Sequence, residues 1–108
     1  MFELQTRPTA DGIILDLQGA LGKEGGEAVL SAVQAITPPP QRLVLNFSAA
    51  GPINTAGLGG VLWAVRLVTR AGGIVTAYGL SEHFRKVCHV MGLTAYIRLE
   101  LDEEAALN

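Results

Sequence analysis

Three short apolar segments, separated by longer helical patterns, constrain the fold of this chain more than any other feature. They cover residues 13–17, 43–47 and 74–78. The middle segment (LVLNF) is almost wholly apolar, as expected of a strand in a sheet that is covered on both faces. Strands that alternate with helices imply a mainly parallel sheet with right-handed crossovers. The pattern therefore predicts an α/β domain.

Helical patterns fill the intervals between these strands. Apolar residues recur at helical spacing after Gly26 and after Ala56, and a third stripe follows Ser81, a predicted N-cap. Three consecutive prolines at 38–40 must end the first helix, because proline lacks an N–H donor and clashes with the preceding turn. Residues 48–55, rich in Gly, Pro and Asn, are predicted to form a loop. The remaining expected elements are extended pieces at 4–7 and 96–99 and a terminal helix at 102–107.

Length and composition indicate one globular domain over residues 1–108. Apolar residues make up 49% and charged residues 17%, so a core can form and disorder is not expected. The net charge of −2 and the lack of a basic block argue against nucleic-acid binding. Polar residues interrupt the least charged stretch, 43–65, so we expect no membrane insertion. A lone cysteine and an N-terminus unlike a signal peptide fit a cytoplasmic protein.

The junction at residues 53–59 (INTAGLG) resembles the signature of STAS domains, where an Asp-Ser-Ser-Gly-Leu-Gly run follows a short strand. The resemblance extends over nearly the whole chain, through residues 19–22 (GALG), 42–48 (RLVLNFS) and 87–93 (VCHVMGL). It is carried by this ordered set and not by one motif. The resemblance implies the STAS fold: a mixed, mostly parallel sheet of four or five strands, with helices packed on one side.

The resemblance also implies a function without catalysis. In the anti-sigma-factor antagonists of this family, the serine before the glycine is phosphorylated by the anti-sigma kinase. A phosphate adds about −1.5 to −2 charge, enough to break a tuned interface. Independently, the unpartnered N–H groups at a helix start make the junction mildly electropositive. We therefore expect docking on an anti-sigma factor or serine kinase. The predicted partner-binding residues are Asn54, Thr55, Ala56, Gly57, Leu58 and Trp63.

The chain departs from the antagonist pattern at the phosphorylated position. Ala56 stands in place of the serine and has no hydroxyl group, so phosphorylation of the usual residue cannot regulate this protein. Asn46 and Asn54 stand where the family often has aspartate. Either Thr55 or Asn54 can cap the start of the helix. Thr55 is also a candidate substitute phosphoacceptor, but we favour the simpler interpretation that it caps the helix, a role in which threonine is common.

Two alternative functions stay open. The sequence of residues 54–57 (NTAG) is intermediate between the antagonist signature and a second version of the motif, Asp-Thr-Gly-Gly. That version occurs in the cytoplasmic STAS subunit of lipid-transport ABC systems, where the threonine helps contact the ATPase. The chain could then be a regulatory subunit of such an ATPase or of a stress-sensing complex. The second alternative is a carrier that binds a nucleotide or lipid at the mouth between sheet and helix. The sequence leaves open whether the chain forms an oligomer.

No set of side chains points to catalysis, to a cofactor or to a metal. Cys88 falls on the apolar stripe of its helix and is predicted to be a core residue. His83 and His89 do not share a helix face, and no carboxylate completes a metal-binding set with them. The glycines of the junction lack the spacing of a phosphate-binding loop. We therefore predict that the protein is not an enzyme.

Two residues of the helix after the junction have different expected environments. Leu58 is predicted to face the core, together with Leu62 and Val65. Trp63 lies off this face and near Arg66 at helical spacing. It is equally well interpreted as a docking residue or as a partly buried tryptophan at the edge of the core.

Overall fold

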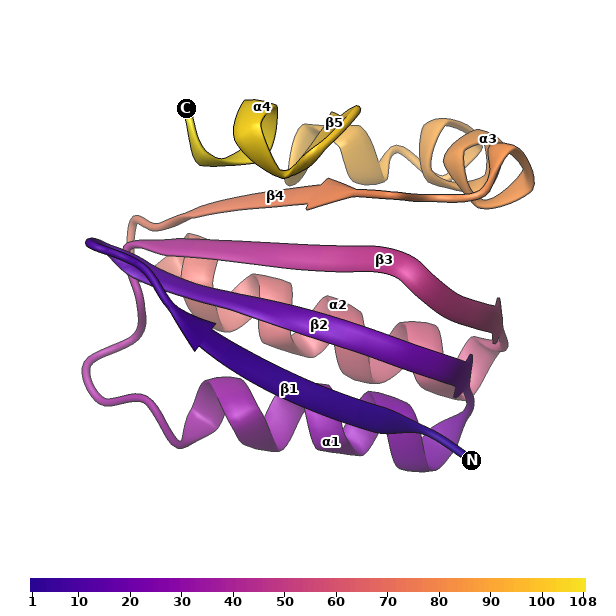
Figure 1. Ribbon diagram of the computed structural model, residues 1–108, viewed down its shortest axis with the longest axis horizontal. Coiled ribbons are helices and arrows are strands. Elements are labelled where there is room, and N and C mark those ends of the chain that lie inside the picture. The colour runs from indigo at the N-terminus through magenta and orange to yellow at the C-terminus, as the bar shows by residue number, and fades with distance from the viewer.

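The computed structural model describes residues 1–108 and contains one five-stranded sheet (Figure 1). The strands follow the sequence order across the sheet; β1 is antiparallel to β2, and the other pairs are parallel. The α/β class and the mixed, mostly parallel sheet are thus confirmed. The strands are β1 (Glu3–Pro8), β2 (Gly12–Leu21), β3 (Arg42–Ile53), β4 (Ile74–Tyr78) and β5 (Ile97–Glu100). The helices are α1 (Lys23–Gln34), α2 (Thr55–Arg70), α3 (Glu82–Val90) and α4 (Glu103–Leu107), with a 3-10 turn η1 (Leu93–Ala95).

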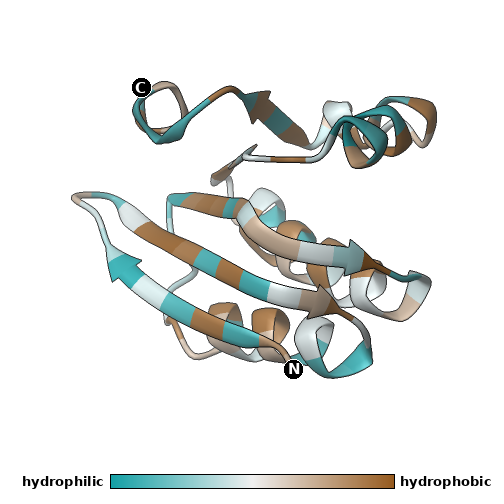
Figure 2. Cartoon of the chain, turned by 45° about the vertical axis from the view of Figure 1, so that its right-hand side comes forward, coloured by the Kyte–Doolittle hydropathy of each residue, from teal (hydrophilic) through white to brown (hydrophobic).

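The main core lies between one face of the sheet and helices α1, α2 and α3. The central strands are mostly hydrophobic, as Figure 2 shows. Alternate strand residues point toward these helices because side-chain direction has a period of two along a strand. Full burial of each such side chain stabilises the fold by about 1.5–3 kcal/mol. The fully buried residues include Leu15, Leu17, Leu43, Leu45, Val29, Val33, Val61, Val65 and Val68. None of the helices is both long and apolar enough to cross a membrane.

The short helix α4 packs against the opposite face of the sheet. Its Ala106 is fully buried and joins Ile14, Val44 and Tyr78 in a second, smaller core cluster. The expectation that helices cover one side therefore holds for α1 to α3, and α4 is the exception. A helix this short covers only the middle of that face, and polar side chains occupy the neighbouring surface.

Those polar side chains form a network that links β1, β2, β3, β4 and α4. Arg7 donates hydrogen bonds to Asp16 at 2.6 and 2.8 Å and to Glu103 at 2.5 Å, and Asn46 donates to Asp16 at 2.7 Å. Hydrogen bonding to Arg7 holds the pKa values of both carboxyl groups below their usual range. Burial, together with a hydrogen bond to Glu103, raises the pKa of Tyr78 to about 12. Because every member has a partner, the network serves to fix α4 on the sheet.

The prediction of a loop at residues 48–55 is wrong over most of its length, because β3 continues to Ile53. The end of β2 supplies the pairing partners, and β3 has one extra residue at each of two register shifts, between Asn46 and Ala49 and between Ala50 and Ile53. Pro52 is tolerated there because β3 pairs with β4 only as far as Asn46 and is an edge strand beyond it. Gly, Pro and Asn indicate a turn locally, but the neighbouring strand overrides that preference.

Helices α1 and α2 approach closely through glycines. A Cβ atom at Gly60 of α2 would lie 2.3 Å from the carbonyl oxygen of Gly26 in α1, and one at Gly26 would lie 2.8 Å from the carbonyl oxygen of Gly57. Both distances are shorter than a van der Waals contact, so only glycine permits this packing. Gly59, in contrast, faces open space.

Gly60→Ala should lower the free energy of unfolding by about 1–3 kcal/mol, because its methyl group must push the two helix backbones apart. The matched control is Gly59→Ala, which should raise it by up to about 1 kcal/mol, because alanine is the better helix former and meets no neighbour. Chemical denaturation of the two variants is the measurement. Equal effects would show that the α1–α2 contact is looser than described.

Candidate functional site

The start of α2 is held by Asn54. Its backbone is extended, and its side-chain oxygen accepts a hydrogen bond from the Gly57 N–H at 2.9 Å. The Asn54 N–H in turn donates to the carbonyl oxygen of Leu21 at 3.1 Å, which ties the helix start to the end of β2. Of the two candidate caps, Asn54 is therefore the N-cap, and the favoured interpretation of Thr55 as the cap is wrong. Asparagine caps helices at least as well as threonine, and Thr55 becomes the first helical residue.

The five junction residues predicted to bind a partner differ in exposure. Asn54, Thr55 and Ala56 are exposed, and the Thr55 hydroxyl makes no hydrogen bond within the chain. Gly57 is buried, because a Cβ atom there would lie 2.0 Å from the carbonyl oxygen of Leu21; it positions the helix and contributes little surface. Leu58 is half-buried and packs on the edge of the core, so the expectation that it faces the core holds only in part.

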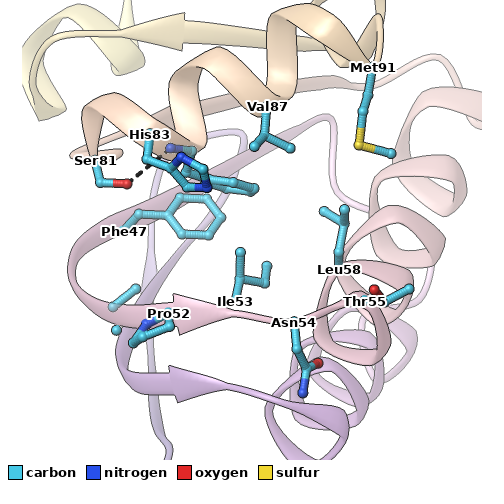
Figure 3. A pocket seen from close by; sticks show the side chains of 13 residues that line it. Phe47, Pro52, Ile53, Asn54, Thr55, Leu58, Ser81, His83, Val87 and Met91 are labelled. Carbon is cyan, nitrogen blue, oxygen red and sulfur yellow. Dashed lines mark hydrogen bonds between the residues drawn. The ribbon is translucent and has the colours of Figure 1, made fainter.

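A pocket of about 430 Å³ opens beside the junction, between the end of β3, the start of α2 and α3. Figure 3 shows the side chains of Ile53, Leu58 and Val87 pointing into it. Most of its lining is apolar, and His83 is its only titratable side chain. The pocket suits an apolar group and offers no pair of groups for acid–base chemistry. Its lining residues are Phe47, Ala50, Gly51, Pro52, Ile53, Asn54, Thr55, Leu58, Ser81, His83, Phe84, Val87 and Met91.

The pocket exists because β3 is longer than its neighbour β4. β3 has 12 residues and β4 has 5, so the far end of β3 has no strand beside it. α3 begins over this end: Ser81 is the N-cap, as predicted, and accepts a hydrogen bond from the Phe84 N–H at 3.1 Å. The Phe84 ring packs on Phe47 with 5.5 Å between ring centroids and forms the floor.

Sequence reasoning missed the α3 side of this pocket. Val87 and Met91 fall on the apolar stripe that follows Ser81, a pattern that by itself indicates core residues, yet Met91 is 55% exposed. Only the packing of α3 over the end of β3 brings these residues opposite Leu58. The one signal available was the position of Met91 at the very end of the stripe.

The other candidate residues lie outside the pocket. Trp63 is 58% exposed on α2, and the Arg66 guanidinium lies 5.7 Å from the centre of its ring. Cys88 is 2% exposed in the core, as predicted, and burial raises the pKa of its thiol, which disfavours the reactive thiolate. His83 and His89 are both exposed. No group of three metal-ligating side chains is close enough to hold a metal ion.

Comparison with known proteins identifies the fold. No family model matches the chain, and no curated protein matches it in sequence. An anti-sigma factor antagonist from Mycobacterium paratuberculosis matches in structure, with a TM-score of 0.82, 18% identity, and coverage of 99% of this chain and 92% of that one. The STAS domain of a SulP transporter from Vibrio cholerae matches with a TM-score of 0.66, 16% identity, and coverage of 84% and 74%. This chain has the STAS fold.

A third STAS-like match is the Bacillus cell fate determinant SpoIIAA in its phosphorylated form. It is 22% identical, has a TM-score of 0.75, and the match covers 97% of this chain and 96% of that one. The matches to M. paratuberculosis and Bacillus proteins span nearly the full length of both chains. The STAS fold that the ordered set of motifs predicted is thus confirmed, and the role of the junction itself stays a prediction.

Asn54→Ala should lower the free energy of unfolding by about 1 kcal/mol, because the Gly57 N–H at the helix start loses its acceptor. Thr55→Ala is the matched control and should change it by less than about 0.5 kcal/mol, since the Thr55 side chain is exposed. Urea denaturation of both variants tests the assignment. A larger loss in Thr55→Ala would restore threonine as the cap.

Proposed function

We propose that this STAS domain is a non-catalytic regulator that docks on a protein partner, in the manner of an anti-sigma-factor antagonist. We call the start of α2 (residues 54–56) and the adjoining pocket the docking site. The observation that carries the proposal is the juxtaposition of three exposed helix-start residues with an open apolar pocket. The residues that dominate protein–protein binding are typically anchors that fill pockets of the partner. The absence of an acid–base pair in the pocket supports binding without catalysis.

An anti-sigma factor or a serine kinase is the partner class that the resemblance supports. The similar SpoIIAA has been solved in a phosphorylated form, and the signature resemblance matches its family's phosphorylated serine to Ala56. Ala56 is exposed on the first turn of α2 and lacks a hydroxyl group. We therefore propose that this chain docks without the usual phosphate switch and stays competent for docking whether or not the kinase is active.

Ala56→Asp should weaken partner binding by more than about 2 kcal/mol, because it places a charge at the centre of the docking site. The fold should tolerate the change, since a carboxylate at a helix start interacts favourably with the helix dipole. Calorimetry with the partner recovered from the native host is the measurement. Binding as tight as that of the parent would contradict the proposal.

Ala56→Ser provides the matched control for charge and size. This variant should bind like the parent and, when incubated with the partner kinase and ATP, should gain one phosphate in intact-mass measurement. The parent should stay unmodified or be modified only at Thr55, whose exposed hydroxyl has no partner in the chain. Stoichiometric phosphate mapped to Ser48 or Ser81 in the parent would show that the switch lies elsewhere.

Met91→Glu tests the pocket separately from the helix start. Met91 lines the pocket and is 55% exposed, so the fold should survive while a buried charge at the interface weakens docking by at least about tenfold. Val90→Glu is the control: Val90 is the neighbouring residue, is 87% exposed, and does not line the pocket. Equal loss of partner binding in both variants would remove the pocket from the docking site.

One observation favours a second candidate function. The Thr55 hydroxyl is exposed and does not cap α2, so it is available to a partner. That is the role which the resemblance to the STAS subunit of lipid-transport ABC systems implies for this threonine. If the partner is such an ATPase, Thr55→Val should weaken binding more than Ala56→Ser does. The anti-sigma proposal expects these two variants to bind alike.

A further inference from the structure

A second groove lies between the C-terminal half of α2 and η1 and has a volume of about 330 Å³. It adjoins the docking site on α2 but shares no lining residue with it. Leu62, Val65 and Leu93 give it an apolar floor, and Arg66, Arg70 and Tyr96 stand around it. Leu62 and Val65 also belong to the core-facing stripe, so the groove is a shallow opening onto the main core. Nothing in the proposed docking mechanism uses it.

The charge of this groove has no counterpart within the chain. Arg66 and Arg70 lie one helical turn apart, both are exposed, and neither is in an ion pair. The whole of α2 contains no aspartate or glutamate, and neither does η1. The chain as a whole has a net charge of −2, so this is a local positive patch on a mildly acidic molecule. It attracts acidic groups at close range.

One exposed aromatic residue lines the groove, and another contacts one of the groove's arginines. The chain has one tryptophan and two tyrosines; Trp63 is 58% exposed and Tyr96 is 62% exposed, while Tyr78 is buried. Tyr96 lines the groove, and Trp63 stacks with Arg66 at 5.7 Å. Tryptophan, tyrosine and arginine are the residue types most enriched at the energetic centres of protein interfaces.

We propose that Trp63, Arg66, Arg70 and Tyr96 form a second binding surface, which takes an acidic segment of a protein partner with an apolar side chain inserted between them. Two arginines suit a pair of carboxylates, whereas a nucleic-acid site typically contacts about 6–10 phosphates and a lipid-surface patch typically contains about 4–8 basic residues. The groove and the docking pocket share no lining residue, and Arg66 lies about 16 Å along the helix from Thr55.

The test is selection of random dodecapeptides displayed on phage against the full chain at low salt. Enriched peptides should contain several Asp or Glu residues around an aromatic or aliphatic one. Chemically synthesised copies of the enriched peptides should bind the variant Arg66→Glu/Arg70→Glu at least about tenfold more weakly than they bind the parent. The affinity of these peptides for the parent should fall as salt is added. Lys23→Glu/Lys86→Glu is the matched control, because it changes the net charge equally at two exposed positions elsewhere. These peptides should bind the control like the parent.

Several results would overturn this proposal. They are failure to enrich any peptide, enrichment of peptides without acidic residues, and equal weakening in the two charge-reversal variants. Tighter binding to a single-stranded oligonucleotide or to anionic lipid vesicles would assign the surface to another class of partner. Circular dichroism checks that both variants fold. If Arg66→Glu/Arg70→Glu does not fold, Arg66→Gln/Arg70→Gln takes its place. Ala56→Asp should leave peptide binding unchanged; weakening there would place the peptides in the docking site, so the two proposals fail separately.

Discussion

The close approach of α2 to the ends of α1 and β2 is the contact on which the candidate site depends. It requires glycine at positions 26, 57 and 60, where any Cβ atom would collide with backbone. Once α2 is seated there, the Asn54 N–H reaches the carbonyl oxygen of Leu21, and the first turn of the helix emerges at the edge of the sheet. Residues 54–56 are exposed as a consequence of this packing. Gly57, which belongs to the resemblance to the STAS signature, thus serves in this structure to allow close packing.

The pocket beside that first turn follows from a different constraint, the unequal length of neighbouring strands. β3 runs past the end of β4, and α3 covers the resulting gap only partly. The opposite face of the sheet has no comparable opening, because α4 and the hydrogen-bonded network around Arg7 occupy it. Charge and apolar surface are therefore separated: paired charges fix the fold on one face, and the unpaired apolar pocket lies at the edge of the other.

Local patterns of the sequence predict most of this fold and little of the site. The apolar runs at 13–17, 43–47 and 74–78 are strand cores because burial on both faces leaves them no other environment, and the N-cap Ser81 is recognisable from its residue type and position. The extension of β3 to Ile53 depends on β2 as a pairing partner, which no local signal reports. Asn54 and Thr55 are both good caps, and only the tie to the end of β2 decides between them. The pocket likewise needs three elements to meet.

If the start of α2 docks on a partner as proposed, the lack of a hydroxyl group at Ala56 limits how that docking can be controlled. A phosphate there would act at the centre of the interface and switch binding on and off, whereas alanine leaves occupancy to the concentration of the partner and to its intrinsic affinity. The second binding surface proposed on the same helix then matters, because α2 would carry both contacts, with Arg66 about 16 Å from Thr55. If one partner makes both contacts, binding at the docking site raises the effective concentration of the acidic segment at the second surface. The overall affinity then rises without a phosphate at position 56. If they are made by two partners, the helix joins them. In either case, control would lie in the availability of the acidic segment.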